Sequence, residues 1–296
     1  MLLLFLPERS WNCWICRMDY RSNLLEQENG GPGAARNTAL NEISKLKQID
    51  YVAFLDSDDE WQSEHLADAA FALNSGYDFY FCDTQRTDFF DSYFETISSL
   101  RNNGAAIREK ATPFSDSGGS YGFPAHSLTT EFIEEYLCHT STIVVRASMV
   151  RDIRFAEELR YCSEDWLFWI TLADAGARIA ISWKKNGVSG EGLNIYFSAF
   201  DWDSPKSANI IFGLYVFSIF LFRMFRSGPE RASCKAKLSR FRRAASYIFT
   251  RCLLRRIPMK WSVVRTIARN DPVIIPLFPY YLLSAIFDRG EDARNW

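Results

Sequence analysis

Hydrophobic and polar positions over the first two hundred residues predict an alternation of helices and strands. Apolar residues at helical spacing predict a helix over 32–47, and the continuous apolar run YVAFL predicts a strand over 51–55 buried on both faces. A helix capped by Ser63 and ending near residue 74 follows, and then a short strand at 77–82. Later segments of the same kind are helices at 129–137 and 163–175 and strands at 141–146 and 178–182. This order is typical of an α/β fold with a mostly parallel sheet, flanking helices and functional loops after the strands.

The rest of the chain does not share this alternation. Residues 1–26 show no clear period, and residues 84–128 are irregular and predict an insertion that covers or shapes a site. Beyond about residue 200, apolar and basic helical segments continue to the C-terminus. We therefore expect an atypical N-terminal segment over 1–26, an α/β domain over 27–204 and a helical extension over 205–296.

The apolar runs of the chain are short. None reaches without interruption the roughly 18–20 residues that span a bilayer. The longest are residues 210–222, which end at Arg223, and residues 273–287, which contain two prolines. These runs predict buried helices or segments that lie at an interface.

Charge divides the chain more sharply than composition does. The 296 residues are 48% apolar and 24% charged, which is a globular composition, and their net charge of −2 argues against a dedicated nucleic-acid binder. Residues 221–270, however, contain fourteen Lys or Arg and one acid, Glu230, for a net charge of +13. The remainder of the chain carries −15. An acidic body with a basic, aromatic-rich tail indicates a soluble catalytic part and a segment that meets an anionic surface.

Seven cysteines are too few for a disulfide scaffold. The one close pair, Cys13 and Cys16, has no partner pair at zinc-finger spacing. We interpret these residues as ordinary thiols of a reducing compartment.

The acidic segment FLDSDDEW, at 54–61, is the strongest local signal for chemistry. Asp56, Asp58 and Asp59 follow directly after the predicted strand. Mg²⁺ and Mn²⁺ take oxygen ligands, usually one or two carboxylates together with substrate phosphates. The alternative is a solvated acidic turn that caps the next helix. On either interpretation His65, which lies in that helix, is expected to be a surface or packing residue.

Two further segments carry weaker signals. Gly30, Gly31, Pro32 and Gly33 precede a helix that contains Arg36, and such a turn either approaches a phosphate closely or is an ordinary turn. Glu164 and Asp165 stand at another helix start, where a carboxylate serves as a general base or simply favours the helix dipole.

The chain contains, in this order, the segments NGGPGAARNTAL, YVAFLDSDDEW and RFAEELRYCSEDWLFWITLADAGARIA. Together they resemble the GT-A glycosyltransferases of family 2, which are nucleotide-sugar-dependent and mostly inverting. The resemblance covers about residues 27–197 and implies a GT-A fold, similar to the Rossmann fold.

By this resemblance, Asp56 and Asp58 form the D-x-D motif. Asp58 is the expected direct ligand of a Mn²⁺ or Mg²⁺ ion, Asp56 lies near the ribose or the metal, and Asp59 supports the site. The resemblance also places Arg36 and Gly31 against the nucleotide donor.

The resemblance further implies that Asp165 is the catalytic base, with Glu164 beside it at the donor. Asp165 would take a proton from the acceptor hydroxyl as that oxygen attacks the anomeric carbon, which inverts the configuration. The expected partners are a UDP- or GDP-sugar and a saccharide or lipid-linked acceptor, in cell-surface polysaccharide synthesis.

The N-terminus departs from the family pattern. Family members begin with a strand like V-S-V-I-I-P-x-Y-N and a second strand that ends in D-D-G-S, and neither precedes Gly30 here. We interpret residues 1–26 as truncated or frame-shifted, with a divergent N-terminus as the alternative. The sheet would then lack its first strand–helix–strand unit, and the chain would be weakly active or inactive.

The extension over 205–296 mixes basic and aromatic residues and predicts peripheral contact with the inner face of the cytoplasmic membrane. A solvated helical face packed on the body is the alternative. No nucleic-acid motif accompanies the charge, so we expect no nucleic-acid partner. Two other functions stay open: a nucleotidyltransferase that makes nucleotide-sugars, and a non-catalytic membrane-associated remnant.

Overall fold

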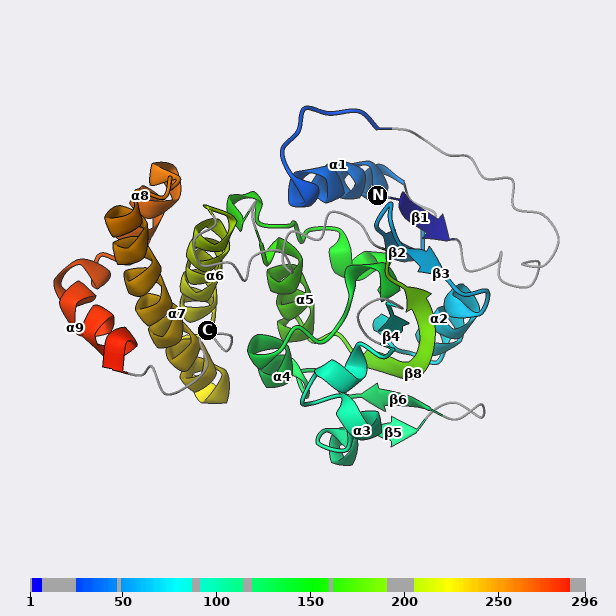
Figure 1. Cartoon of the computed structure of the whole chain (residues 1–296). Helices are drawn as coiled ribbons and strands as arrows, with labels where there is room; N and C mark the ends of the chain where they lie inside the picture. The colour runs from blue at the N-terminus through cyan, green and yellow to red at the C-terminus, as the bar shows by residue number, and fades with distance from the viewer. Residues whose placement is uncertain are drawn as a thin grey trace. The chain divides into compact units, whose positions relative to one another are not determined.

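The computed structural model describes residues 2–6, 25–46, 49–86, 91–113, 119–159, 162–190 and 205–287 (Figure 1). The chain divides into two compact units. The first unit comprises Met1–Phe155 and Phe168–Gly192, and the second comprises Ala156–Leu167 and Leu193–Trp296. The division falls within one helix, Glu164–Asp174 (α5).

The described part of the first unit contains an eight-stranded sheet in the order β1-β2-β7-β4-β8-β6-β5, with β3 also paired to β8. The strands are Leu2–Leu6 (β1), Tyr51–Leu55 (β2), Glu60–Trp61 (β3), Phe79–Gln85 (β4), Thr112–Pro113 (β5), Ser120–Phe123 (β6), Val144–Arg146 (β7) and Ile179–Val188 (β8). The predicted α/β fold is confirmed, but the prediction of a mostly parallel sheet is wrong, because most of the described strand pairs are antiparallel. The strands β2, β4 and β8 run in one direction, but β7 lies between β2 and β4 in the opposite direction, so β4 and β8 are the parallel neighbours within the described sheet.

Helices of the first unit follow the predicted order. They are Pro32–Lys45 (α1), His65–Asn74 (α2), Arg101–Gly104 (α3), Thr129–Glu134 (α4) and the later part of α5. Helix α1 starts where predicted because Pro32 fixes a helical φ and Gly31 before it adopts φ +93°, which favours glycine. The prediction that Ser63 caps α2 is wrong, because the N-cap residue of α2 is Glu64, whose side chain makes no capping hydrogen bond.

Three strands differ from the sequence pattern. Residues 2–6 form β1, antiparallel to β2, although no period predicted a strand there. The strand predicted at 141–146 begins only at Val144, because Thr140–Thr142 form a 3-10 turn. Strand β8 continues to Val188, well beyond residue 182, because β3 and β4 pair with its second half. The predictions for residues 7–24 and 191–204 concern segments outside the described residues.

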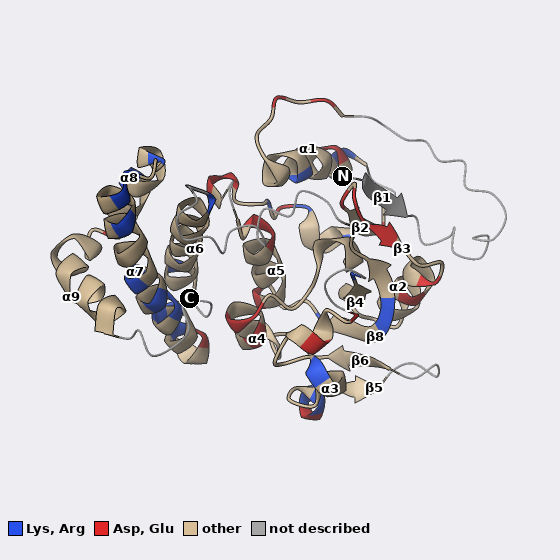
Figure 2. Ribbon diagram, viewed as in Figure 1, with Lys and Arg blue, Asp and Glu red and all other residues tan. Residues whose placement is uncertain are grey.

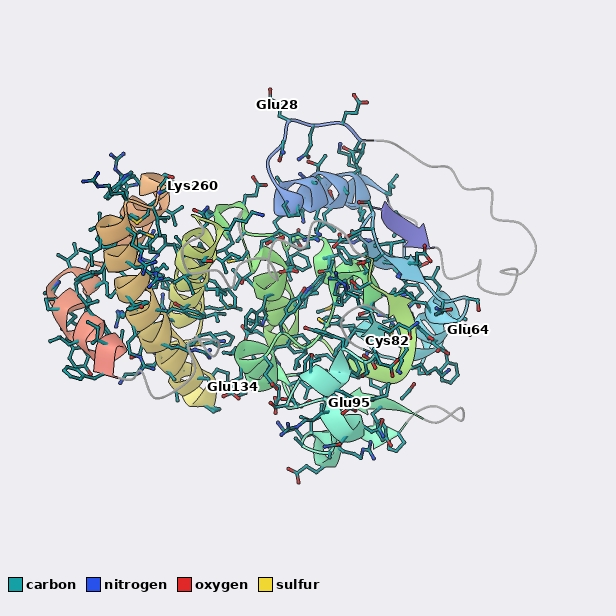
Figure 3. All side chains as sticks on the ribbon, viewed as in Figure 1. Glu28, Glu64, Cys82, Glu95, Glu134 and Lys260 are labelled. Atoms are coloured by element: carbon teal, nitrogen blue, oxygen red, sulfur yellow. The ribbon has the colours of Figure 1, made fainter. Side chains whose placement is uncertain are left out.

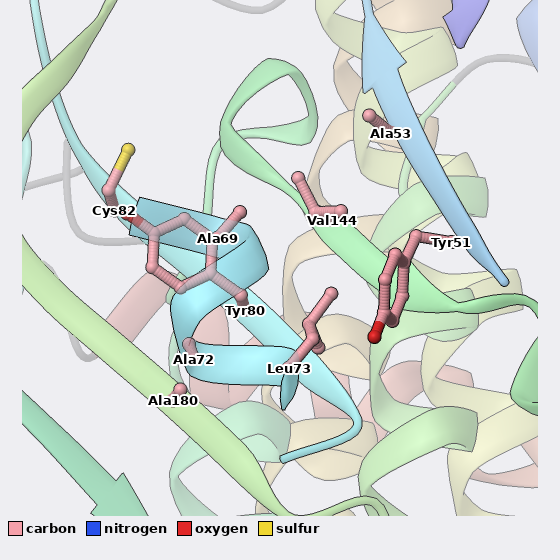
Figure 4. Close-up of a cluster of buried hydrophobic side chains, with 9 residues drawn as sticks. All are labelled: Tyr51, Ala53, Ala69, Ala72, Leu73, Tyr80, Cys82, Val144 and Ala180. Atoms are coloured by element: carbon pink, nitrogen blue, oxygen red, sulfur yellow. The ribbon is translucent and has the colours of Figure 1, made fainter. Parts of the chain in front are cut away.

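The core of the first unit forms where α2 covers the sheet (Figure 4). Its buried cluster consists of Tyr51, Ala53, Ala69, Ala72, Leu73, Tyr80, Cys82, Val144 and Ala180. A second layer is aromatic: Phe155 and Phe168 stack at 4.0 Å between ring centroids, and Trp169 meets Phe54 edge-on at 5.2 Å. Because Phe54 lies two positions before Asp56, this layer fixes the end of β2 at which the three aspartates follow.

The described part of the second unit is helical. Its long helices are Pro205–Met224 (α6), Gly228–Arg255 (α7), Trp261–Asn270 (α8) and Ile274–Phe287 (α9). Buried Asp271, at the α8–α9 junction, accepts two hydrogen bonds from Arg242 at 2.8 and 2.7 Å and one from the Tyr215 hydroxyl at 2.7 Å. Burial alone would raise the pKa of Asp271, but these hydrogen bonds outweigh it and lower the pKa below its usual value. This network ties α6, α7 and α9 together.

Helix α6 is longer and more apolar than the sequence pattern indicated. Its window Lys206–Met224 spans 19 residues with a mean hydropathy of 1.6, so by length and composition it could cross a membrane. Within the structure, 72% of that window is buried, which is also the pattern of a core helix. The predicted buried helix at 210–222 is therefore the middle of a longer one.

Five of the seven cysteines lie in the part of the chain that the structure describes, and all five carry free thiols. They are Cys82, Cys138, Cys162, Cys234 and Cys252. The pair Cys13 and Cys16 lies outside the described residues.

Candidate functional site

The three aspartates after β2 differ in exposure. Asp58 is exposed, the Asp56 side chain is 32% exposed and the Asp59 side chain is 4% exposed. Asp58 makes no side-chain hydrogen bond or ion pair with any residue that the structure describes. One turn therefore presents three carboxylates in three different environments.

Asp59 holds the turn in place. Its Oδ2 accepts a hydrogen bond from the Ser141 hydroxyl at 2.6 Å, and its Oδ1 accepts one from the Gly190 amide at 3.0 Å. The same Ser141 oxygen accepts a hydrogen bond from the backbone amide of Asp56 at 2.9 Å. The His139 Nδ1 lies 3.6 Å from the Asp59 Oδ2. Buried carboxylates of this kind are satisfied by such donors, so Asp59 serves the shape of the turn.

Gly190 packs against the backbone of Asp58. A Cβ at position 190 would overlap the carbonyl oxygen of Asp58, so the close approach requires glycine. The described contacts to this turn come from Ser141 and Gly190, and a role of residues 84–128 in covering or shaping the site stays a prediction.

Asp56 is paired with Arg36. The Arg36 guanidinium lies 3.1 and 3.3 Å from the two oxygens of Asp56, and it packs over the Phe155 ring at 5.4 Å from the centroid. Arg36 is only 4% exposed, and an arginine–carboxylate pair of this kind is a charge-assisted interaction. The structure thus brings together the helix after the glycine turn and the acidic turn, which are two of the three predicted motifs.

The glycine turn itself stands at the N-terminus of α1. The Gly31 amide donates to the Asn29 side chain at 3.1 Å, and the helix start has no side-chain cap. An uncapped helix N-terminus offers amide donors and a partial positive charge to an anion. Next to Arg36, Asn37 exchanges two hydrogen bonds with the backbone of Phe155, at 2.9 and 2.8 Å, and so fixes the helix beside the aromatic layer.

The third motif opens α5, in the second unit. Glu164 is 6% exposed, and the Asp165 carboxylate accepts the amide of Trp166 at 2.7 Å. Ser163 before them has φ +66°, a left-handed conformation that costs free energy in a non-glycine residue. Two acids in the first turn favour the helix dipole. Their catalytic roles stay a prediction.

His65 is a packing residue, as one of the two sequence interpretations had it. It is fully buried, stacks on Trp61 at 4.9 Å and lies with its Nδ1 3.4 Å from the Cys82 sulfur. Burial lowers its pKa to about 3, so it is neutral at ordinary pH. Trp61 in turn donates its indole N–H to the Ser141 carbonyl and belongs to the support of the acidic turn.

Sequence reasoning missed Ser141, His139 and Gly190. Ser141 was interpreted as the first residue of a strand, and Gly190 belonged to no motif. They meet the acidic turn across separations of 82 and 131 residues, which no local pattern reveals.

The arrangement of the possible metal ligands shows what kind of ion site the turn could form. Among the described residues, no group of three or more His, Cys, Asp or Glu side chains is arranged to hold an ion. Exposed Asp58, with Asp56 two positions away, instead offers the one or two carboxylates that Mg²⁺ and Mn²⁺ use when substrate phosphates supply other ligands. These donors fit an ion shared with a substrate better than one held by protein alone.

Part of the chain, including most of this site, is similar in sequence to a known protein family. Residues 15–125, which include the glycine turn, Arg36 and the acidic turn, match the family described as Glycosyl transferase family 2. Over these residues the chain is similar to the family 2 glycosyltransferases, as the resemblance in the sequence implied, and the mixed α/β sheet agrees with the GT-A fold. Asp165 lies beyond the matched residues.

A curated relative extends the likeness over most of the chain. The chain is 29% identical over 258 residues to the Succinoglycan biosynthesis protein ExoW of Rhizobium meliloti (strain 1021). That alignment covers 86% of this chain and 77% of the relative.

Proposed function

We propose that this chain transfers a sugar from a UDP- or GDP-sugar to a saccharide or lipid-linked acceptor, with inversion, in the synthesis of a cell-surface polysaccharide. One observation carries the proposal: Asp58 is an exposed carboxylate without a partner among the described residues, in a turn whose other two acids are already engaged. The family match supports the transferase activity, and the name of the relative supports polysaccharide synthesis.

In this proposal, Asp58 and Asp56 hold a Mn²⁺ or Mg²⁺ ion. When bound, such an ion neutralises the charge of the donor diphosphate as it leaves. Arg36 holds the Asp56 carboxylate in place, and Ser141 and Gly190 hold Asp59 so that Asp58 stays exposed. The glycine turn at Gly31 provides amide donors toward the nucleotide, with Glu164 as a further donor-binding residue.

Asp165 acts as the base of the proposed reaction. It takes the proton of the acceptor hydroxyl while that oxygen attacks the anomeric carbon from the side opposite the leaving diphosphate. One displacement of this kind inverts the configuration, and a positioned base contributes on the order of 10²–10⁴ in rate.

The proposed enzyme works at the inner face of the cytoplasmic membrane. Residues 205–296 supply the peripheral contact, because this segment carries the basic charge of the chain.

The test uses the full chain with a panel of UDP- and GDP-sugars, in Mn²⁺, in Mg²⁺ and in EDTA, with octyl glycosides as acceptor probes. We expect release of nucleoside diphosphate that requires the metal and falls about a hundredfold or more in Asp58→Asn. Asp152→Asn, which changes another exposed aspartate, is the matched control and keeps the rate. Release of pyrophosphate would show a nucleotidyltransferase instead, and an Asp58→Asn rate equal to the unaltered rate would reject the metal assignment.

The base is tested separately. Asp165→Asn should lower transfer to the octyl glycosides by about a hundredfold while donor affinity changes little, because the base acts on the acceptor. Asp174→Asn, at the other end of the same helix, is the control. Transfer by Asp165→Asn at the unaltered rate would overturn the assignment.

A further inference from the structure

Helix α9 is apolar on all sides, and within the described part of the chain one side of it is buried while the opposite side is exposed. Ile274, Tyr281 and Ala285 are buried against the second unit. The opposite side, which we call the α9 outer face, consists of Ile275, Leu277, Tyr280, Leu283, Ile286 and Phe287. Ile275 and Tyr280 are each 64% exposed and Phe287 is 80% exposed. Contiguous apolar surface of this kind on a soluble unit marks an interaction site.

The end of α7 and the start of α8 extend this apolar surface. Phe249 on α7 lies 5.8 Å from Phe278 of α9 and 6.3 Å from Trp261, measured between ring centroids. Trp261 is 53% exposed, and Leu254 one turn further along α7 is 80% exposed. The Arg242–Tyr281 hydrogen bond and the Phe249–Phe278 contact together align α9 antiparallel to α7, so its first turns lie near these residues.

Among the described residues of helices α7 to α9, the exposed charged side chains beyond Glu230 are all basic. The exposed cations of this region are Arg255, Arg256, Lys260, Arg265 and Arg269. The one acidic residue between positions 231 and 287 is Asp271, which is buried and hydrogen-bonded to Arg242. Figure 2 shows this division: the ribbon carries blue positions on α7 and α8, and none on α9. Lys260 lies at the corner between α7 and α8 (Figure 3).

We propose that the α9 outer face, together with Trp261 and the basic corner of Arg255, Arg256 and Lys260, lies in the headgroup region of an anionic membrane. This inference rests on the peripheral membrane contact of the proposed function and assigns it to a surface. An apolar helix face with bordering cations inserts into that region, and tryptophan favours the same depth.

Charge decides between a membrane and a second copy of the chain. Two copies that met through this surface would bring like charges together, because the exposed charged residues described over 231–287 are all cations. An anionic lipid surface supplies the missing negative charge and attracts each cation. The observed border therefore favours lipid over self-association.

The experiment measures co-sedimentation of the full chain with phosphatidylcholine vesicles that either contain or lack phosphatidylglycerol. We expect binding to the anionic vesicles, a loss of roughly tenfold or more in the double variant Leu283→Asp, Phe287→Asp, and a similar loss in Arg255→Glu, Lys260→Glu. Phe71→Asp is the matched control, because Phe71 is 52% exposed on α2 in the first unit, and it should bind as the unaltered chain does. Circular dichroism of each variant checks that it is folded.

Equal vesicle binding by the α9 variants and the unaltered chain would overturn the inference. So would light scattering that shows the unaltered chain as a dimer and the α9 variants as monomers, because the face would then bind a second copy. Nucleoside diphosphate release without vesicles is measured in parallel. Turnover without vesicle binding rejects this inference alone, and vesicle binding without turnover rejects the proposed transferase activity alone.

Discussion

Asp56, Asp58 and Asp59 show how neighbouring residues of one type acquire different roles. Asp56 is held by a cation, Asp59 by a hydroxyl and an amide, and Asp58 is left to solvent. The difference comes from partners distant in sequence and not from the aspartates themselves. We therefore expect substitution of Asp59 to lower mainly stability and substitution of Asp58 to lower mainly activity.

Asp59→Asn is expected to destabilise the first unit, whereas Asp58→Asn is not. An asparagine amide at position 59 would turn an NH₂ group toward either the Gly190 amide or the Ser141 hydroxyl, and a buried group left unsatisfied costs about 1–3 kcal/mol. Exposed Asp58→Asn should change the free energy of unfolding by less than about 0.5 kcal/mol. Urea denaturation measures both. Equal loss of stability in the two variants would contradict these assignments.

His65 predicts a pH dependence of stability. Burial lowers its pKa to about 3, while the unfolded chain has the ordinary value near 6.5. Between these values the unfolded state binds the extra proton, so the free energy of unfolding should fall as pH drops below about 6.5, by at most about 1.4 kcal/mol per pH unit. Urea denaturation at several pH values measures this slope.

A variant without the titrating group isolates the contribution of His65. His65→Gln should show a shallower slope than the unaltered chain over the same pH range. His126→Asn is the control, because His126 is exposed and asparagine tolerates its φ of +63°. A slope in His65→Gln equal to that of the control would show that another group carries the pH dependence.

Among the elements, those set by local pattern were predictable. Strand β2 has the predicted bounds, and α1 begins at the predicted proline, because an apolar run and a Pro–Gly turn act within a few residues. Strand β8 was underestimated because its polar second half is strand only through pairing with β3 and β4. Strand β1 was missed for the same reason, since its partner β2 is some fifty positions away in the chain.

In the candidate site too, short sequence motifs were predictable and contacts between distant residues were not. The motifs with Arg36 and Asp58 could be recognised because each is a short run. The Arg36–Asp56 pair joins two such runs and required the fold to be known. Ser141 and Gly190 carry no local signature, because their role depends on tertiary contacts alone.

The Asp271 network predicts how the helices of the second unit depend on one another. Asp271→Asn removes the charge that two Arg242 hydrogen bonds and the Tyr215 hydroxyl share. Loss of one partner of a buried ion pair costs about 3–5 kcal/mol, because the remaining charge stays buried. We expect a lower thermal midpoint, measured by circular dichroism at the helix signal.

The matched variant for Asp271 is Asp152→Asn, which removes an exposed carboxylate. It should leave the thermal midpoint nearly unchanged. The Asp271 prediction would be wrong if both variants melted together with the unaltered chain. Because hydrogen bonds lower the pKa of Asp271, its stabilisation should also persist at neutral pH and fade only in acid.

At the scale of the whole molecule, charge is segregated along the chain. A local net charge of +13 over 221–270 stands against a total of −2. The basic residues gather on α7 and α8, next to an apolar helix, while the predicted metal ligands belong to an acidic body (Figure 2). Such a division suits a protein that binds an anionic surface with one part and keeps that surface away from its acidic part by repulsion.

This segregation predicts how salt changes membrane binding. Raising salt from about 0.1 M to about 1 M shortens the Debye length from about 10 Å to about 3 Å, so attraction between exposed cations and anionic lipid is screened. Insertion of the α9 outer face is apolar and is not screened. Preference for phosphatidylglycerol-containing over pure phosphatidylcholine vesicles should therefore vanish at high salt, while weak binding to both remains. The Leu283→Asp, Phe287→Asp variant should lose that residual binding as well. Co-sedimentation across a salt series measures both effects, and an anionic preference that persists at high salt would contradict a contact built from exposed charge.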